Sequence, residues 1–273
     1  KQTAGFMMEV RRYGDAIEHL ELMRDTMGDD FDVDSVVKLS RCKYLNGDLG
    51  AAQRAVEKLL GFDPLTNSFD EEKAKATDNV TAYLVLAALL RDDFDTDLAE
   101  QVINHAVEVN PGNYEALLQR AKSILRYSTA DDRIEKAKAD IQQALELNPD
   151  DEQVILTAAQ IAIADEDLET AETHLDRGVQ EFPESVAIFT ARSDLARLQK
   201  NPEEALNWLL QGLETNPESP ILTLKKCEME LSEKDVEAAE ESLVLLRSLG
   251  AGTDWVNYLE VRLLMIEEKW RKA

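Results

Sequence analysis

Cysteine, glycine and proline are all scarce in this sequence. Its 2 cysteines in 273 residues, Cys42 and Cys227, exclude a fold held together by a disulfide framework. Glycine (11) and proline (7), the residues that interrupt helices, are few, and this bias favours helix throughout. No apolar run reaches the roughly 18 residues that a membrane-spanning helix needs, and no signal peptide is visible. Two thiols fit a reducing compartment and slightly favour the cytoplasm, but they leave a periplasmic or secreted setting open.

Basic residues are strongly outnumbered. The chain has 30 Lys and Arg against 55 Asp and Glu, a formal net charge of −25. Such a surface repels phosphate backbones and anionic lipid headgroups, so we expect neither nucleic-acid binding nor membrane insertion. Residues 127–273 alone carry 15 basic and 32 acidic side chains. This half would attract a basic partner; the alternative is that its acidic residues only keep the chain in solution.

What is abundant is a repeat with a period of 34 residues, visible in the spacing of Pro149, Pro183 and Pro217. Alanine occurs twelve residues before each proline-containing turn and at equivalent places elsewhere: Ala16, Ala52, Ala99, Ala137, Ala171, Ala205, Ala239 and Ala273. A second set of small residues precedes them: Ser40, Ala87, Ala121, Ala159, Ser193 and Cys227. Each set predicts a helix that closely approaches its neighbour, and each proline predicts a helix end.

The period, the paired small residues, the Gly-Asp or Glu-Asp turn and the final Asn-Pro resemble the tetratricopeptide repeat family. The stretches "YLNGDLGAAQRAVEKLLGFDP" and "IADEDLETAETHLDRGVQEFPES" match its pattern closely, and the resemblance covers nearly the whole chain. It implies an all-α fold, a right-handed α-solenoid of antiparallel helix pairs, as one array over residues 1–273. We expect about fourteen helices and no sheet. The repeats are a partial one at 1–32, full ones at about 33–66, 80–113, 114–151, 152–185, 186–219 and 220–252, and a partial one at 253–273.

Three places depart from the pattern. Residues 67–79 are a polar insertion, in which a short helix capped by Ser68 is a guess. The repeat at 114–151 carries four extra residues around "YSTADDRIEK". The last segment, "WVNYLEVRLLMIEEKWRKA", is unusually apolar for the end of an array. We interpret the chain as a piece of a longer repeat protein; the alternative is a complete array whose last helix caps it or mediates a dimer.

Residues with catalytic or metal-binding chemistry do not form a recognisable constellation. His19, His105 and His174 have no second ligand at helical spacing, and neither cysteine has a histidine near it in sequence. The acidic run after Arg91 lacks the glycine and glutamate of a calcium loop. No phosphate-binding loop or nucleophile motif is present. We therefore predict no catalytic residue, no metal site and no cofactor, and a chain that is not an enzyme.

The resemblance places the predicted binding surface on the first helix of each repeat, which lines a concave groove in this family. Three positions per helix share one face of it. The residues that we predict to bind a partner are Val37, Arg41, Tyr44, Leu84, Arg91, Leu118, Lys122, Leu125, Leu156, Gln160 and Ile163. Leu84, Leu118 and Leu156 form an apolar ladder, which either contacts the partner or packs against neighbouring repeats.

The leading hypothesis is a protein-interaction scaffold that binds an extended or helical segment of another protein. The lysines and asparagines with which one subgroup of the family clamps a chaperone's C-terminal carboxylate are missing here, since those places hold Val37, Arg41, Val85, Glu115 and Gln119. Two alternatives stay open. The array could recruit substrates for a larger enzyme whose catalytic part lies outside this chain, or it could self-associate through the C-terminal helix.

Overall fold

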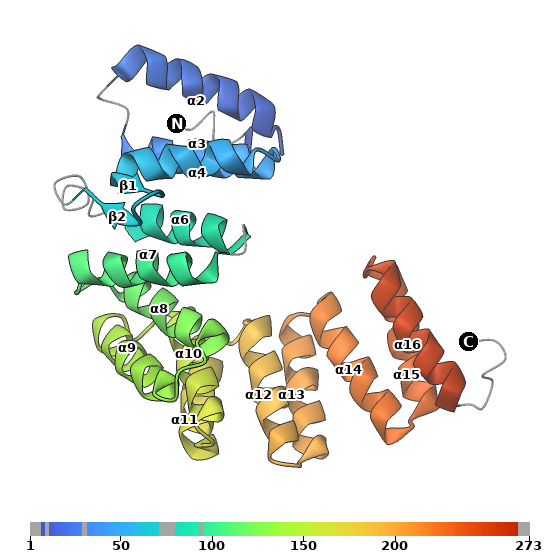
Figure 1. The fold of residues 1–273 in the computed structure, drawn as a ribbon. Coiled ribbons are helices and arrows are strands. Elements are labelled where there is room, and N and C mark those ends of the chain that lie inside the picture. Colours follow the sequence, from blue (N-terminus) through green and yellow to red (C-terminus); the bar gives the residue numbers. More distant parts are fainter. Residues whose placement is uncertain (1–6, 9–10, 29–31, 71–79, 93–94, 267–273) are drawn as a thin grey trace. The chain divides into compact units, whose positions relative to one another are not determined.

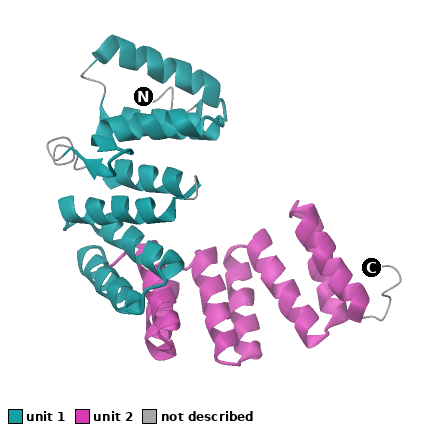
Figure 2. Ribbon diagram, viewed as in Figure 1, with its two compact units in different colours: residues 1–148 teal, residues 149–273 magenta. Residues whose placement is uncertain are grey.

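The computed structural model describes residues 7–8, 11–28, 32–70, 80–92 and 95–266, which form 14 helices and one small hairpin (Figure 1). The chain divides into two compact units, Lys1–Asn148 and Pro149–Ala273 (Figure 2). In unit 1 the elements are α2 (Tyr13–Met27), α3 (Val33–Leu45), α4 (Leu49–Leu60), β1 (Phe62–Asp63), β2 (Ser68–Phe69), α6 (Val80–Asp92), α7 (Thr96–Val109), α8 (Tyr114–Tyr127) and α9 (Arg133–Leu147). In unit 2 they are α10 (Glu152–Ala164), α11 (Leu168–Glu181), α12 (Val186–Leu198), α13 (Pro202–Thr215), α14 (Pro220–Glu233), α15 (Val236–Ser248) and α16 (Thr253–Ile266).

Within each unit the helices form pairs that stack in chain order. The first helix of a pair contacts its own second helix, and that second helix contacts the first helix of the next pair. First helices also contact one another, α3 with α6 and α6 with α8 in unit 1, α10 with α12, α12 with α14 and α14 with α16 in unit 2. This is the all-α solenoid of helix pairs that the sequence predicts.

Side chains at the helix starts explain why the helices begin where they do. The residue before most of them is Asp, Asn or Ser, whose side-chain oxygen accepts a backbone N–H that has no partner within the helix. In the second helices this N-terminal residue is Asp48, Asp95, Asp167, Asn201 or Asp235. These are the polar turn residues of the repeat, so the turn between paired helices is fixed locally.

One turn position requires a left-handed backbone. Gly47 lies there with φ 87°, as do Glu166 (62°), Lys200 (61°) and Lys234 (60°) at the same place in later repeats. Glycine adopts this conformation without strain, whereas a residue with a Cβ does so at a cost. Unit 2 thus holds three strained turns where the pair α3–α4 has none.

The small residues of the repeat lie where paired helices touch. The alanines from Ala16 to Ala239 that the period identifies have no exposed surface, and the first-helix residues from Ser40 to Cys227 are exposed by 1 % or less. The Ser40 hydroxyl donates to the Ala52 carbonyl at 2.7 Å, which joins the two small residues of one pair. Their predicted packing role is confirmed.

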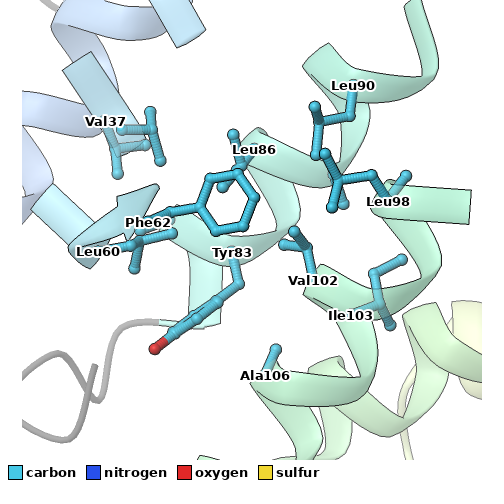
Figure 3. Close-up of a cluster of buried hydrophobic side chains, with 14 residues drawn as sticks. Val37, Leu60, Phe62, Tyr83, Leu86, Leu90, Leu98, Val102, Ile103 and Ala106 are labelled. Atoms are coloured by element: carbon cyan, nitrogen blue, oxygen red, sulfur yellow. The ribbon is translucent and has the colours of Figure 1, made fainter. Parts of the chain in front are cut away.

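The core of unit 1 is continuous across the pairs α3–α4 and α6–α7. Val37, Leu60 and Phe62 meet Tyr83 and Leu86 in a buried cluster that continues to α7 (Figure 3). Burying such side chains contributes about 1.5–3 kcal/mol each, which holds successive repeats together.

A β-hairpin in unit 1 departs from the expectation of no sheet. Phe62 pairs with Phe69 and Asp63 with Ser68 in an antiparallel register. The two phenylalanine rings lie 4.9 Å apart, and Phe69 stacks on His105 of α7 at 4.1 Å. The guess that Ser68 caps a helix is therefore wrong, because its backbone belongs to β2; residues 71–79 of the insertion lie outside the described part.

Candidate protein-binding face

A hollow of about 370 Å³ opens on the first-helix face of unit 1. Its sides come from three consecutive first helices, with Arg41 and Tyr44 from α3, six residues from α6 and Gln119 from α8. The α6 residues are Thr81, Leu84, Val85, Ala88, Leu89 and Asp92. Three of the predicted residues, Arg41, Tyr44 and Leu84, are brought together here. Their neighbours Val85, Ala88 and Asp92 were not predicted, although they lie on the same turns of α6.

Tyr44 of α3 and Asp92 of α6 both line this hollow. The Asp92 carboxylate, as a hydrogen-bond partner of the Tyr44 hydroxyl, raises the pKa of Tyr44 above its ordinary value. The aromatic side chain is 41 % exposed. Tyrosine in such a place offers an apolar face and a polar tip to a ligand, as residues enriched in protein interfaces do.

Arg91, another predicted residue of α6, contacts side chains of the next first helix. Its guanidinium donates to the Ser123 hydroxyl at 2.7 Å and lies 5.1 Å from the centre of the Tyr127 ring. Arg126 lies over the same ring at 5.5 Å. Arg91 therefore joins α6 to α8, and two arginines flank an aromatic ring that is 43 % exposed. Cation–π contacts of this kind contribute about 0.5–2 kcal/mol.

Most of the predicted apolar ladder is buried. Leu118 is exposed by only 4 %, as is Val37 at the same helical position of α3, whereas Leu84 is half-buried at the hollow. Leu125 and Lys122 on α8 are also half-buried. The buried members pack against neighbouring helices, which was the alternative explanation of the ladder. Their role in binding stays a prediction, and in this conformation they could act only by supporting the surface above them.

The remaining predicted residues lie on α10 in unit 2. Leu156 is 7 % exposed, Ile163 is half-buried and Gln160 is exposed. Further along this unit, a hollow of about 260 Å³ is lined by charged side chains of α12, α14 and α16, among them Arg197 and Glu228. The two units therefore present first-helix faces of different chemistry.

Buried ion pairs between helices are a feature that the sequence did not reveal. Arg120 of α8 forms two bonds of 2.7 and 2.6 Å to Asp140 of α9, whose side chain is 7 % exposed. In unit 2 the buried guanidinium of Arg192 lies 2.9 Å from Glu172 and from Asp176 on α11. Removing Arg120 would leave the buried Asp140 charge unpaired, and removing Arg192 would leave two carboxylates of α11 without their shared partner, so these residues belong to the fold more than to a site.

The described residues give no sign of a metal centre or a membrane span. No three His, Cys, Asp or Glu side chains in that part of the chain are grouped as ligands for an ion. None of its helices has the length and apolar character to cross a bilayer. His105 stacks on Phe69, and burial lowers the pKa of His174.

Stacked antiparallel helix pairs with small residues at each crossing define the class of helical-repeat solenoids. A family model described as "Tetratricopeptide repeat" matches residues 128–195. The chain also shares its fold, along nearly its whole length, with a solved tetratricopeptide-repeat protein. Such repeats serve protein–protein interaction in general.

Solved structures share this fold at low identity. A tetratricopeptide repeat protein from Parabacteroides merdae is 17 % identical, with a TM-score of 0.69 and 96 % of each chain covered. PilW, a type IV pilus biogenesis factor, is 15 % identical, with a TM-score of 0.62 over 83 % of this chain and 97 % of its own. The APC/C hetero-tetramer Cut9-Hcn1 is 14 % identical, with a TM-score of 0.61 over 96 % of this chain and 48 % of that one. No curated protein matches the sequence.

Proposed function

We propose that this protein is a non-catalytic scaffold that holds a segment of another protein against the first-helix face of unit 1. The hollow between α3, α6 and α8 supports this proposal. Leu84, Val85 and Ala88 give it an apolar floor, and Tyr44 and Asp92 form one side of it. An apolar side chain of a partner would lose its hydration against this floor.

Charge indicates which segment fits. Arg41 of α3 lies at the hollow. Lys122 and Arg126 lie on α8, the first helix of the pair that follows α6 and α7. This local basic character stands out in a chain with a net charge of −25. The expected ligand is an extended or helical segment with an apolar anchor and acidic groups beside it, because such groups are attracted to this face and repelled by the rest.

Filling the hollow tests the proposal. Random peptides displayed on phage would be selected on the whole chain, and the enriched peptides would be titrated against Ala88→Trp and Ala187→Trp. Both alanines are exposed on first helices, but only Ala88 lines the hollow. We expect Ala88→Trp to weaken binding about tenfold or more and Ala187→Trp to leave it unchanged. Equal binding to both variants would refute this location.

A charge variant tests the acidic character of the ligand separately. Arg41→Glu should slow association and reverse its dependence on salt, because an exposed rim charge acts mainly by steering. Arg41 is the better choice than Arg91, which is engaged with Ser123 and Tyr127. Enrichment of basic peptides, or of peptides insensitive to Arg41→Glu, would contradict the predicted ligand chemistry while leaving the hollow as a site.

A further inference from the structure

The last described helix, α16, is apolar on two opposite sides. One side carries Val256, Leu259 and Leu263, which are buried against α14 and α15. The other carries Trp255, Tyr258, Val261 and Met265, which are 57 %, 51 %, 38 % and 62 % exposed. Isolated apolar residues on a surface are ordinary, but four on one helix face are typical of an interaction surface.

These exposed residues share their face with two charges. At about 100° per residue, an arc of about 120° on this helix contains Asp254, Trp255, Tyr258, Val261, Arg262 and Met265. Asp254 is exposed and Arg262 is half-buried, with its guanidinium 5.8 Å from the Tyr258 ring. The face therefore has an aromatic and aliphatic centre with one acid near its start and one base near its end.

The order of these residues is self-complementary. Tyr258 lies four residues after Asp254 and four before Arg262, and it lies three residues from both Trp255 and Val261. If two copies of α16 run antiparallel about a two-fold axis at Tyr258, Asp254 of each copy meets Arg262 of the other. Trp255 of each then meets Val261 of the other, and the two Tyr258 rings meet at the axis. An isologous contact needs a patch that matches itself in this way.

We propose that the chain forms a homodimer through this face of α16, with the two helices antiparallel and Tyr258 at the two-fold axis. One helix face on each side buries little surface, less than the total of about 1,200 Å² below which interfaces are weak or transient. The dimer should therefore appear at micromolar concentrations and above. This contact is separate from the hollow of unit 1, and either can exist without the other.

The test is the mass of the whole chain in solution, measured by sedimentation from about 1 to about 300 µM. We expect a monomer–dimer equilibrium that Tyr258→Glu weakens at least tenfold. Leu198→Glu, which changes a leucine of α12 that is 55 % exposed, serves as the matched control and should leave the equilibrium unchanged. A monomer at every concentration, or a dimer that Tyr258→Glu does not weaken, would overturn the proposal.

Charge-reversal variants test the antiparallel register of the two helices, because they should restore association when mixed as well as abolish it singly. Arg262→Asp places acid against acid in both halves of the contact, and Asp254→Arg places base against base, so each variant should be monomeric. Mixed together, the two variants restore both opposite pairs and should form a heterodimer. A mixture that stays monomeric, although each variant keeps the parent's helical content, would contradict the antiparallel register.

Cross-linking checks the axis directly. Under oxidation Tyr258→Cys should yield a covalent dimer, because this position meets itself. Asn257→Cys, exposed on the same helix but outside the face, should remain monomeric. Cross-linking at Asn257 and not at Tyr258 would place a different face of α16 at the contact.

Discussion

The two units build the same helix pair by different means. In unit 2 the proline-containing turns follow the 34-residue period, and two glycines allow second helices to approach the next first helix closely. A Cβ on Gly178 of α11 would lie 2.6 Å from the Ile188 side chain of α12, and one on Gly212 of α13 would lie 3.0 Å from the Leu222 side chain of α14. Unit 1 has alanine at Ala106 and Ala144 instead, with a hairpin and a lengthened turn between its helices. The second helices of unit 2 thus leave room for a neighbouring side chain where those of unit 1 carry a methyl group.

Their surfaces differ as well. Unit 1 carries 18 basic and 28 acidic residues, and unit 2 carries 12 and 27. The first-helix hollow of unit 1 has an apolar floor, whereas on that face of unit 2 Lys225 is paired with Asp194 at 2.8 Å and Arg197 lies 3.6 Å from Asp194. One fold can therefore present an apolar binding face and a self-neutralised charged face, depending on a few exposed positions per helix.

The largest effect that we predict separates core from surface within unit 1. Leu118→Ala should lower the free energy of unfolding by about 2–5 kcal/mol, because it empties a site that is 4 % exposed. Leu84→Ala, at the half-buried floor of the hollow, should cost much less and should weaken peptide binding instead. Urea denaturation with peptide titration distinguishes the two; equal losses of stability would place Leu84 in the core with Leu118.

Overpacking tests the helix crossing in unit 2. Ala171 has no exposed surface where α11 meets its neighbours, so Ala171→Leu should destabilise the protein by about 1–3 kcal/mol. Ala187→Leu, at an exposed position of α12, is the control and should be nearly neutral. An unchanged melting temperature for Ala171→Leu would contradict the tight crossing.

A smaller effect is expected at the close approach between α13 and its neighbours. Gly212→Ala adds a Cβ within 3.0 Å of Phe189 and Leu222, which should cost more than the gain of about 1 kcal/mol in helix propensity. We expect a net loss of about 0.5–2 kcal/mol. Gly14→Ala in unit 1, with nothing within 4 Å of the new Cβ, should be neutral or slightly stabilising by thermal denaturation. If both substitutions changed the stability in the same direction, helix propensity alone would account for the effects.

The smallest effect concerns the left-handed turn position. Lys200→Gly should stabilise unit 2 by about 0.5–1 kcal/mol, because it removes the strain of a positive φ at an exposed residue. Gly47→Lys introduces the same strain at the matching position of unit 1 and should destabilise by about 1 kcal/mol. Urea midpoints measure both changes, and shifts in the same direction would show that turn strain does not govern them.

The fold could be predicted from the sequence because its signals are local and repeated. Every described alanine of the series from Ala16 to Ala239 lies buried at a helix contact, as the period required. The hairpin escaped prediction because its two strands have two residues each, too few to show an alternating pattern. Phe62 and Phe69 were the available signal, an aromatic pair flanking a turn.

The binding face could be predicted only in part. Helical phase identified the side of each first helix that carries Arg41, Tyr44 and Leu84, and these three residues line one hollow in the structure. It could not tell which edge of that side the next first helix covers, so it left open whether Leu118, which is buried, contacts a partner or packs against neighbouring repeats. Contacts between residues far apart in sequence, such as Arg91 with Ser123, depend on how the helices stack. They produce no regular spacing in the sequence from which they could be predicted.

The placement of the two thiols allows each unit to be observed on its own. Cys42 lies buried in unit 1 and Cys227 lies buried in unit 2. Burial raises the pKa of both thiols, that of Cys227 to about 11, so little reactive thiolate forms while the surrounding helices stay closed. Alkylation at each site should therefore follow the opening of its own unit, as in native-state exchange experiments. The rates at the two sites would rank the local stability of the two halves in a single unlabelled molecule.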